Sequence, residues 1–298
     1  MRFYEVTSVL SSPASVLSQI DKDRSREKAE QLLGTFVSLL SESPDCYMRF
    51  SAALPLTRIY LLLLGDKPSS FVAKQVLDLI ALSLDKSKSF SRKFELVSGW
   101  TIVKTVIPDV WDASIHAAAF GILLGQDRGQ EPFVTCSHIF PAILGSLTSL
   151  LAIVAHESYP QGVDATENSV CNISSLNGRF LLTRTLEANG RAATNVEAIL
   201  EELIILQSSC PTFRELFESQ QTTQTFIKAF QSFVARLSSS DDISRNHIRT
   251  SEKLMHFALT LALDNAVAGP QKREVCLRFR LHSLSLTLSQ DPRYSAKC

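Results

Sequence analysis

The side chains that most often carry chemistry are spread thinly along this sequence. Only one histidine lies close to a cysteine, in the triplet Cys136-Ser137-His138. A zinc site needs about four ligands around one ion, and no second pair of ligands completes a motif with this one. We interpret the triplet as a packed helical turn, with a metal-ligand pair as the alternative. The histidines are His116, His138, His156, His247, His256 and His282, and the cysteines are Cys46, Cys136, Cys171, Cys210, Cys276 and Cys298.

Two pairs of adjacent carboxylates, Glu201-Glu202 and Asp241-Asp242, are the remaining candidates for acid–base work. Neighbouring residues on a helix point in different directions, so neither pair is arranged to share a proton. Asp241 and Asp242 are better explained as charges that favour a helix N-terminus. The sequence contains no GxSxG elbow, no phosphate-binding glycine loop and no HExxH. We therefore predict no catalytic residues, no cofactor and no metal site; an enzyme whose site is assembled from distant residues is the alternative.

The two tryptophans, Trp100 and Trp111, are candidate contacts for a partner because tryptophan is enriched at binding hot spots. Both lie in strongly apolar stretches. We predict that they pack in the core, with a surface hot spot as the alternative.

Charge argues against a nucleic-acid partner. The chain of 298 residues has 30 basic and 30 acidic residues, whereas nucleic-acid binders usually carry a basic excess. Local basic clusters, Arg24/Arg26/Lys28 and Lys86/Lys88/Arg92/Lys93, are interpreted as solvated helix faces or ends, with a phosphate-binding patch as the alternative. Six cysteines with no close pair suit a reducing compartment, and the opening MRFYEVTSVLSSP does not match a signal peptide. We therefore expect a cytoplasmic protein.

An uncharged stretch, residues 132–156, is long enough to span a bilayer. Polar residues dilute it, Pro141 interrupts it and no basic flank orients it. We predict a fully buried central helix rather than a membrane span.

Apolar residues recur three and four positions apart through most of the chain, which predicts amphipathic helices. The clearest stripes are Ala29/Leu32/Leu33/Phe36/Val37/Leu40, Val72/Val76/Leu79/Ile80/Ser83, Val196/Ile199/Leu200/Leu203/Ile204 and Phe226/Phe230/Phe233/Val234/Leu237. Residues 276–288 alternate like a strand over short stretches, but Leu277, Leu281, Leu284 and Leu288 also form a helical seam. We favour a helix there.

Proline and glycine mark where these helices meet. Pro44, Pro68, Pro108 and Pro132 stand near the start of apolar segments, and Gly65 and Gly125 close runs ending in Leu-Leu-Gly. Helix pairs then recur about every 40 residues, the period of HEAT and armadillo arrays. We predict an all-α fold, an armadillo/HEAT-like right-handed stack of helices: repeats over residues 1–155, a long polar loop over 156–177, and repeats continuing the same solenoid over 178–298.

One segment, FELVSGWTIVKTVIPDVWDASIHAAAFGILLG (residues 94–125), resembles the helical region upstream of the BEACH domain in large neurobeachin-like proteins, particularly fungal ones. The shared features are Gly99, Val103, Val106, Ile107, Pro108, Trp111 and Leu123 to Gly125. The resemblance covers about a tenth of the chain. It implies an armadillo-like module of a very large cytosolic protein in vesicle trafficking. The BEACH, pleckstrin-like and WD-repeat parts of that family are absent from this chain, so no functional residue is carried over.

The predicted function is a non-enzymatic protein–protein interaction scaffold. Its expected partners are other proteins, without nucleic acid and without a direct membrane span; peripheral endomembrane association would come through a parent protein. The alternative is a stand-alone HEAT/armadillo adaptor of another transport machinery. The polar loop over 156–177 is predicted to lie beside the partner site, because long insertions in solenoids often project near the working surface. The alternative, weighted equally, is a tolerated surface insertion with no role in binding.

Overall fold

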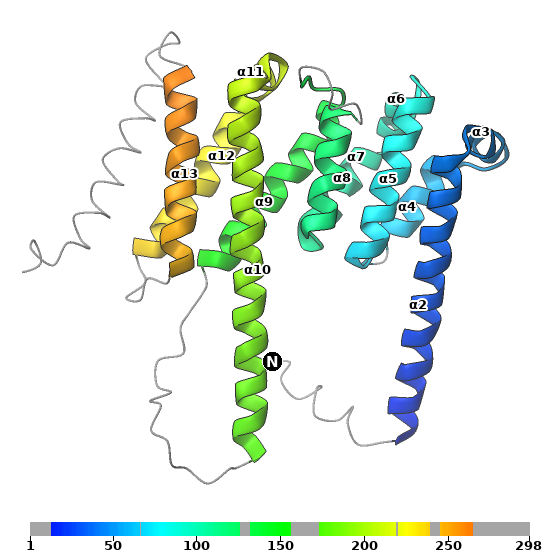
Figure 1. Ribbon diagram of the computed structural model, residues 1–298, viewed down its shortest axis with the longest axis horizontal. Helices are drawn as coiled ribbons and strands as arrows, with labels where there is room; N and C mark the ends of the chain where they lie inside the picture. The colour runs from blue at the N-terminus through cyan, green and yellow to red at the C-terminus, as the bar shows by residue number, and fades with distance from the viewer. Residues whose placement is uncertain are drawn as a thin grey trace, which may run out of the picture. The chain divides into compact units, whose positions relative to one another are not determined.

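The computed structural model describes residues 13–65, 67–125, 132–155, 173–218, 220–238 and 245–264. Within these residues the secondary structure is helical and contains no strand, which confirms the all-α prediction. Twelve α-helices and two short 3-10 helices are described (Figure 1). They are α2 (Pro13–Glu42), α3 (Pro44–Ala53), α4 (Leu56–Gly65), α5 (Ser70–Lys86), α6 (Phe90–Leu96), α7 (Gly99–Val106), η2 (Ile107–Asp109), α8 (Ala113–Leu124), η3 (Ser137–Ile139), α9 (Phe140–Ala155), α10 (Ile173–Ser209), α11 (Pro211–Glu218), α12 (Gln220–Ser238) and α13 (Arg245–Asp264).

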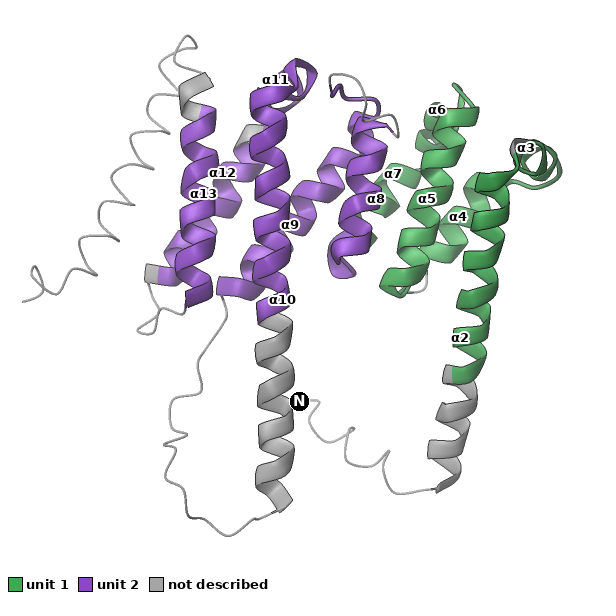
Figure 2. Ribbon diagram, in the orientation of Figure 1, with its two compact units in different colours: residues 1–106 green, residues 107–298 purple. Residues whose placement is uncertain are grey.

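The chain divides into two compact units, residues 1–106 and 107–298 (Figure 2). The first unit contains α2 to α7, and the second contains η2 to α13. The polar segment expected between two halves of the chain lies within the second unit. Its last five residues, 173–177, begin α10 instead of belonging to a loop, while residues 156–172 lie outside the described residues.

In the first unit, α2 and α5 lie side by side and run in the same direction (Figure 1). The Ser69 hydroxyl donates to the Glu30 carboxylate at 2.7 Å, and four residues later along α2 a Cβ at Gly34 would meet the Phe71 ring. Later positions of α2 therefore meet later positions of α5. The shorter α4 and α7 pack behind them, and Tyr60 of α4 hydrogen-bonds Ser83 of α5 at 2.9 Å. Burial raises the pKa of the Tyr60 phenol, so this hydroxyl stays protonated and links the two layers.

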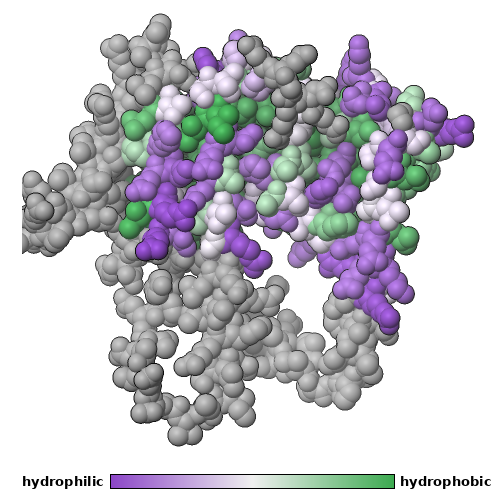
Figure 3. Space-filling view, viewed as in Figure 1, coloured by the Kyte–Doolittle hydropathy of each residue, from purple (hydrophilic) through white to green (hydrophobic). Residues whose placement is uncertain are grey.

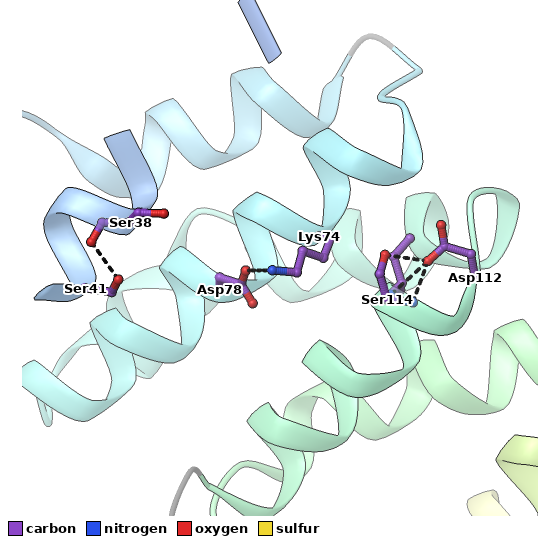
Figure 4. Close-up of polar contacts among 7 residues, drawn as sticks. Ser38, Ser41, Lys74, Asp78, Asp112 and Ser114 are labelled. Carbon is purple, nitrogen blue, oxygen red and sulfur yellow. Dashed lines mark hydrogen bonds and ion pairs between the residues drawn. The ribbon is translucent and has the colours of Figure 1, made fainter. Parts of the chain in front are cut away.

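The α5 stripe predicted from the sequence is the centre of this core, since Val76, Leu79, Ile80 and Ser83 are all buried. Ser69 caps α5 by accepting a hydrogen bond from the Val72 backbone N–H. Lys74 pairs with Asp78 one turn later on the same helix, and both side chains are half-buried (Figure 4). The same view shows Ser41 donating to the Ser38 carbonyl near the end of α2.

The α2 stripe is only partly correct. Val37 and Leu40 are buried, but Leu32 is 71% exposed. The helix presents only one narrow line of residues to α5 and α3, so an apolar residue beside that line stays in solvent.

The turn between α6 and α7 is tight. Ser98 has a left-handed backbone (φ 57), and a Cβ at Gly99 would lie 2.5 Å from the Phe94 ring. That ring is fully buried between Phe90, stacked at 5.4 Å, and Trp100, edge-on at 5.1 Å. The close approach of the two helices therefore requires glycine at position 99.

We expect Gly99→Ala to lower the free energy of unfolding by about 1–3 kcal/mol, because the new methyl group must displace a ring that is packed on both faces. Gly121→Ala is the matched control: position 121 lies inside α8 with open space around it, and alanine there should stabilise the helix by about 0.5–1 kcal/mol. Urea denaturation of both variants measures the difference. Equal effects of the two substitutions would contradict the close packing at Gly99.

In the second unit, α9 is the central helix. It packs against η2, η3, α10 and α12. Most of its length is buried, including Phe140, Ile143, Leu147, Leu151 and Val154. Ile153, however, is 45% exposed, so the helix is not covered on every side as the sequence predicted.

By length and apolar composition, one described helix could cross a membrane, Ser137–Ala155, with 56% of it buried inside the structure. A second, α3 with α4, qualifies only as a broken span bent by 84°. Pro141 does not interrupt α9, because it stands in the first turn, where no backbone N–H is needed.

The other proline and glycine signals have mixed outcomes. Pro44 is the first residue of α3, and Gly125 ends α8 with φ 80, as glycine after a helix allows. Pro108, in contrast, lies in η2, and α8 begins only at Ala113, after Asp112. The Asp112 carboxylate accepts from the backbone N–H groups of Ser114 and Ile115 and from the Ser114 hydroxyl (Figure 4). This side-chain cap, rather than the proline, sets the start of the helix.

Candidate interaction surface

The core of the second unit contains five phenylalanines from four helices. Phe217 of α11 contacts Phe140 of α9, Phe213 of its own helix, Phe226 of α12 and Phe257 of α13, with ring centroids 5.4–6.1 Å apart. All five rings are buried. This cluster fixes the positions of α9, α11, α12 and α13, and thus the surface they present.

Two side-chain hydrogen bonds join segments of this unit that are distant in sequence. His247 of α13 donates from Nε2 to the carbonyl of Val154, in the last turn of α9, at 2.7 Å. Because a carbonyl only accepts, the hydrogen resides on Nε2. The Val134 N–H donates to the Thr212 hydroxyl at the start of α11. Arg214 of α11 donates to the carbonyls of Gln207 and Ser208, which end α10.

Two ion pairs connect α10 to α13 on the exposed side. Arg249 contacts Glu197 at 2.9 Å, and Lys253 contacts Glu201 one turn later. Both pairs join residues 52 positions apart, so the two helices run in the same direction. Figure 3 shows hydrophilic side chains along these two helices. We call these four residues the charge ladder; its charges sum to zero, so it presents alternating sign rather than a basic surface.

The residues singled out for chemistry are dispersed. Cys136 is buried, which raises the pKa of its thiol, whereas His138 is exposed. The His116 ring packs between Trp111 and Phe120, with centroid distances of 6.0 and 4.6 Å. His256 is exposed on α13. Among the described residues, no three histidine, cysteine or acidic side chains are grouped to hold a metal ion.

The two carboxylates of the Glu201-Glu202 pair lie in different surroundings. Glu201 belongs to the charge ladder, while Glu202, the next residue on α10, is half-buried on another side. Asp241 and Asp242 lie outside the described residues, as do His156, His282, Cys171, Cys276 and Cys298. Cys46 is half-buried and Cys210 is buried.

Both tryptophans are buried with 7% of their surface exposed, which confirms the core interpretation. The four most exposed large apolar residues among those described are instead aliphatic, while Phe133 is the most exposed aromatic residue, at 53%. In the first unit, Leu62 of α4 and Leu96 of α6 are 77% and 78% exposed. In the second, Ile205 of α10 is 56% exposed, one turn beyond Glu201.

Sequence reasoning did not find the charge ladder. Its signal was present as two acids four residues apart, Glu197 and Glu201, and two bases with the same spacing, Arg249 and Lys253. Matching charges at matching intervals on two helices predict a parallel pair, but only once the helices are known to be neighbours.

No protein-family model, curated protein or solved structure matches the chain.

Proposed function

We propose that this chain is a non-enzymatic scaffold for protein–protein interactions, built as an armadillo/HEAT-like stack of helix pairs. The observation that carries the proposal is the parallel packing of non-consecutive helices within each unit. The contact between α2 and α5 joins residues 39 apart, and the charge ladder joins residues 52 apart. In a stack of helix pairs, the first helix of one pair lies parallel to the first helix of the next, at intervals of about 40 residues.

The surface supports proteins as the partners. Exposed leucines and isoleucines beside paired charges of both signs suit a protein surface, whereas a nucleic-acid backbone requires a concentration of basic residues. The chain is neutral overall and its charge ladder is balanced. The exposed basic residues Lys86, Lys88, Arg92 and Lys93 lie at the end of α5, in the turn after it and on α6, which fits their interpretation as solvated helix ends.

The resemblance of residues 94–125 to the helical region of BEACH-type proteins adds a biological setting to this proposal. In that setting the chain is an armadillo-like module of a large protein in vesicle trafficking, cytoplasmic and associated with endomembranes through its parent. A stand-alone adaptor of another transport machinery is the second candidate. The full reading frame separates the two: a BEACH domain after Cys298 favours the first, and a stop codon there excludes it.

Deleting residues 161–170 tests where the partner binds. The deletion stops before α10, which begins at Ile173, and a short Gly/Ser replacement should leave the melting temperature nearly unchanged, because loop length has a small effect on stability. We expect the deletion to reduce the amounts of copurifying proteins, measured by quantitative mass spectrometry against the parent chain.

A variant with the same ten residues in reversed order keeps the length and changes only the sequence. Loss of partners in both variants assigns recognition to the sequence of this segment. An unchanged set of partners in both would contradict this placement and direct attention to the exposed helix faces. If no protein is retained specifically by the parent chain, the scaffold proposal itself fails.

A further inference from the structure

The corner between α3 and α4 in the first unit exposes a run of apolar residues. The two helices meet at 84°, and the residues at the corner, 52–55, are alanine, alanine, leucine and proline, all of them exposed. Leu54 is 41% exposed. Met48, one turn before Ala52 on the same face of α3, is 55% exposed. We call residues 48–58 the α3–α4 corner.

The backbone of this corner pairs its own N–H groups. The Leu54 N–H donates to the Phe50 carbonyl at 3.0 Å, the Leu56 N–H donates to the Leu54 carbonyl at 2.9 Å, and Pro55 has no N–H. An unpaired backbone donor makes it unfavourable to move a segment out of water. Residues 54–56 can therefore enter an apolar medium without leaving a donor unpaired.

The charges within the corner are all positive. Arg49 stands one turn before Ala53, and Arg58 lies in the first turn of α4, where its backbone N–H donates to the Pro55 carbonyl. Both arginines are exposed, and neither forms an ion pair with another described residue. Residues 46–65 contain no aspartate or glutamate. An anionic bilayer matches both features in one surface, because its headgroups attract arginine and the layer beneath them takes up apolar side chains.

The rest of α4 limits how deep such a contact reaches. Leu56, Tyr60 and Leu64 are buried, and Tyr60 is hydrogen-bonded to Ser83 of α5. Because these residues belong to the core of the first unit, α4 cannot leave it to cross a bilayer. The corner is the part that remains available, which favours attachment at the membrane interface over a broken span.

We propose that the α3–α4 corner attaches the chain directly to anionic lipid bilayers. Met48 and Leu54 enter the apolar layer beneath the headgroups, and Arg49 and Arg58 contact the lipid phosphates and carboxylates. This peripheral contact belongs to the first unit itself and does not depend on the proposed scaffold function.

Cosedimentation of the full chain with lipid vesicles tests the charges. Vesicles of phosphatidylcholine with roughly 30% phosphatidylserine should bind the chain more tightly than vesicles of phosphatidylcholine alone. Arg49→Gln and Arg58→Gln should each raise the Kd about fivefold, and the double variant about twenty-five-fold. Lys104→Gln, at an exposed position of α7, is the matched control and should leave the Kd unchanged. Absence of binding by the parent chain, or an equal loss in all the single variants, would overturn the proposal.

Leu54→Trp tests insertion. The fluorescence emission of the new indole should shift to shorter wavelength when phosphatidylserine vesicles are added, because the side chain leaves water. Trp100 and Trp111 are buried and supply a constant background. Leu32→Trp, at a 71% exposed position of α2, is the control and should show no shift. Vesicle binding without a shift at position 54 contradicts the proposed contact.

Light scattering without lipid identifies a different occupant of the corner. We expect a monomer for the parent chain and for Leu54→Glu. A dimer of the parent chain that Leu54→Glu converts to a monomer would show that a second copy covers the corner, and this result overturns the proposal.

Discussion

Phe217→Ala should lower the free energy of unfolding by roughly 3–5 kcal/mol, measured by urea denaturation. The ring contacts four other phenylalanines on α9, α11, α12 and α13, so its removal leaves a cavity that no single helix can shift to fill. Phe133→Ala is the control, because Phe133 is 53% exposed and its loss should cost well under about 1 kcal/mol. Similar losses in the two variants would contradict the cluster as the centre of the second unit.

Trp111→Ala should lower stability by a similar amount, about 3–5 kcal/mol, because a ring with 7% exposure between η2 and α8 is replaced by a methyl group. The indole N–H is buried and has no hydrogen-bond partner among the described residues. Trp111→Phe should therefore cost clearly less than alanine, since it retains an aromatic ring and removes a buried donor.

Thermal melting and partner capture on the same preparations decide between the two interpretations of Trp111. If Trp111→Ala melts like the parent chain and loses a bound protein, the residue belongs to a binding surface and the core assignment is wrong. We expect the reverse: a lower melting temperature and, below that temperature, an unchanged set of bound proteins.

Most of what the sequence predicted correctly about the fold came from the helical spacing of its apolar residues. The stripe on α12 is buried throughout, and those on α5 and α10 are buried except for Val72 and Ile204, which are half-buried. A helix that is half-covered must place most of its apolar side chains inward. Helix boundaries were less predictable. Asp112, not Pro108, sets the start of α8, and a side-chain cap is one hydrogen-bonding residue among many candidates in a sequence.

The sequence predicted burial and side-chain contacts least well where they depend on which helices pack together. Leu32 has the spacing of a core residue and is exposed, since the identity of the helices around α2 is not written in its own sequence. The charge ladder and the buried His247 depend on residues 52 and 93 positions away. Such contacts are set by how helices stack, which local spacing does not encode.

The position of α9 has a consequence for biosynthesis. Its apolar surface is covered by α10, α12 and α13, and its contacts extend to His247, 93 residues after Val154. At a translation rate of about 5–20 residues per second, α9 leaves the ribosome some 5–20 seconds before that residue is made. During this interval η2, η3 and then α10 can pack against α9, but the surface that α12 and α13 later cover is still exposed. We therefore expect the nascent chain to bind chaperones that hold apolar segments, and slow synthesis between α9 and α13 to prolong its exposure to aggregation.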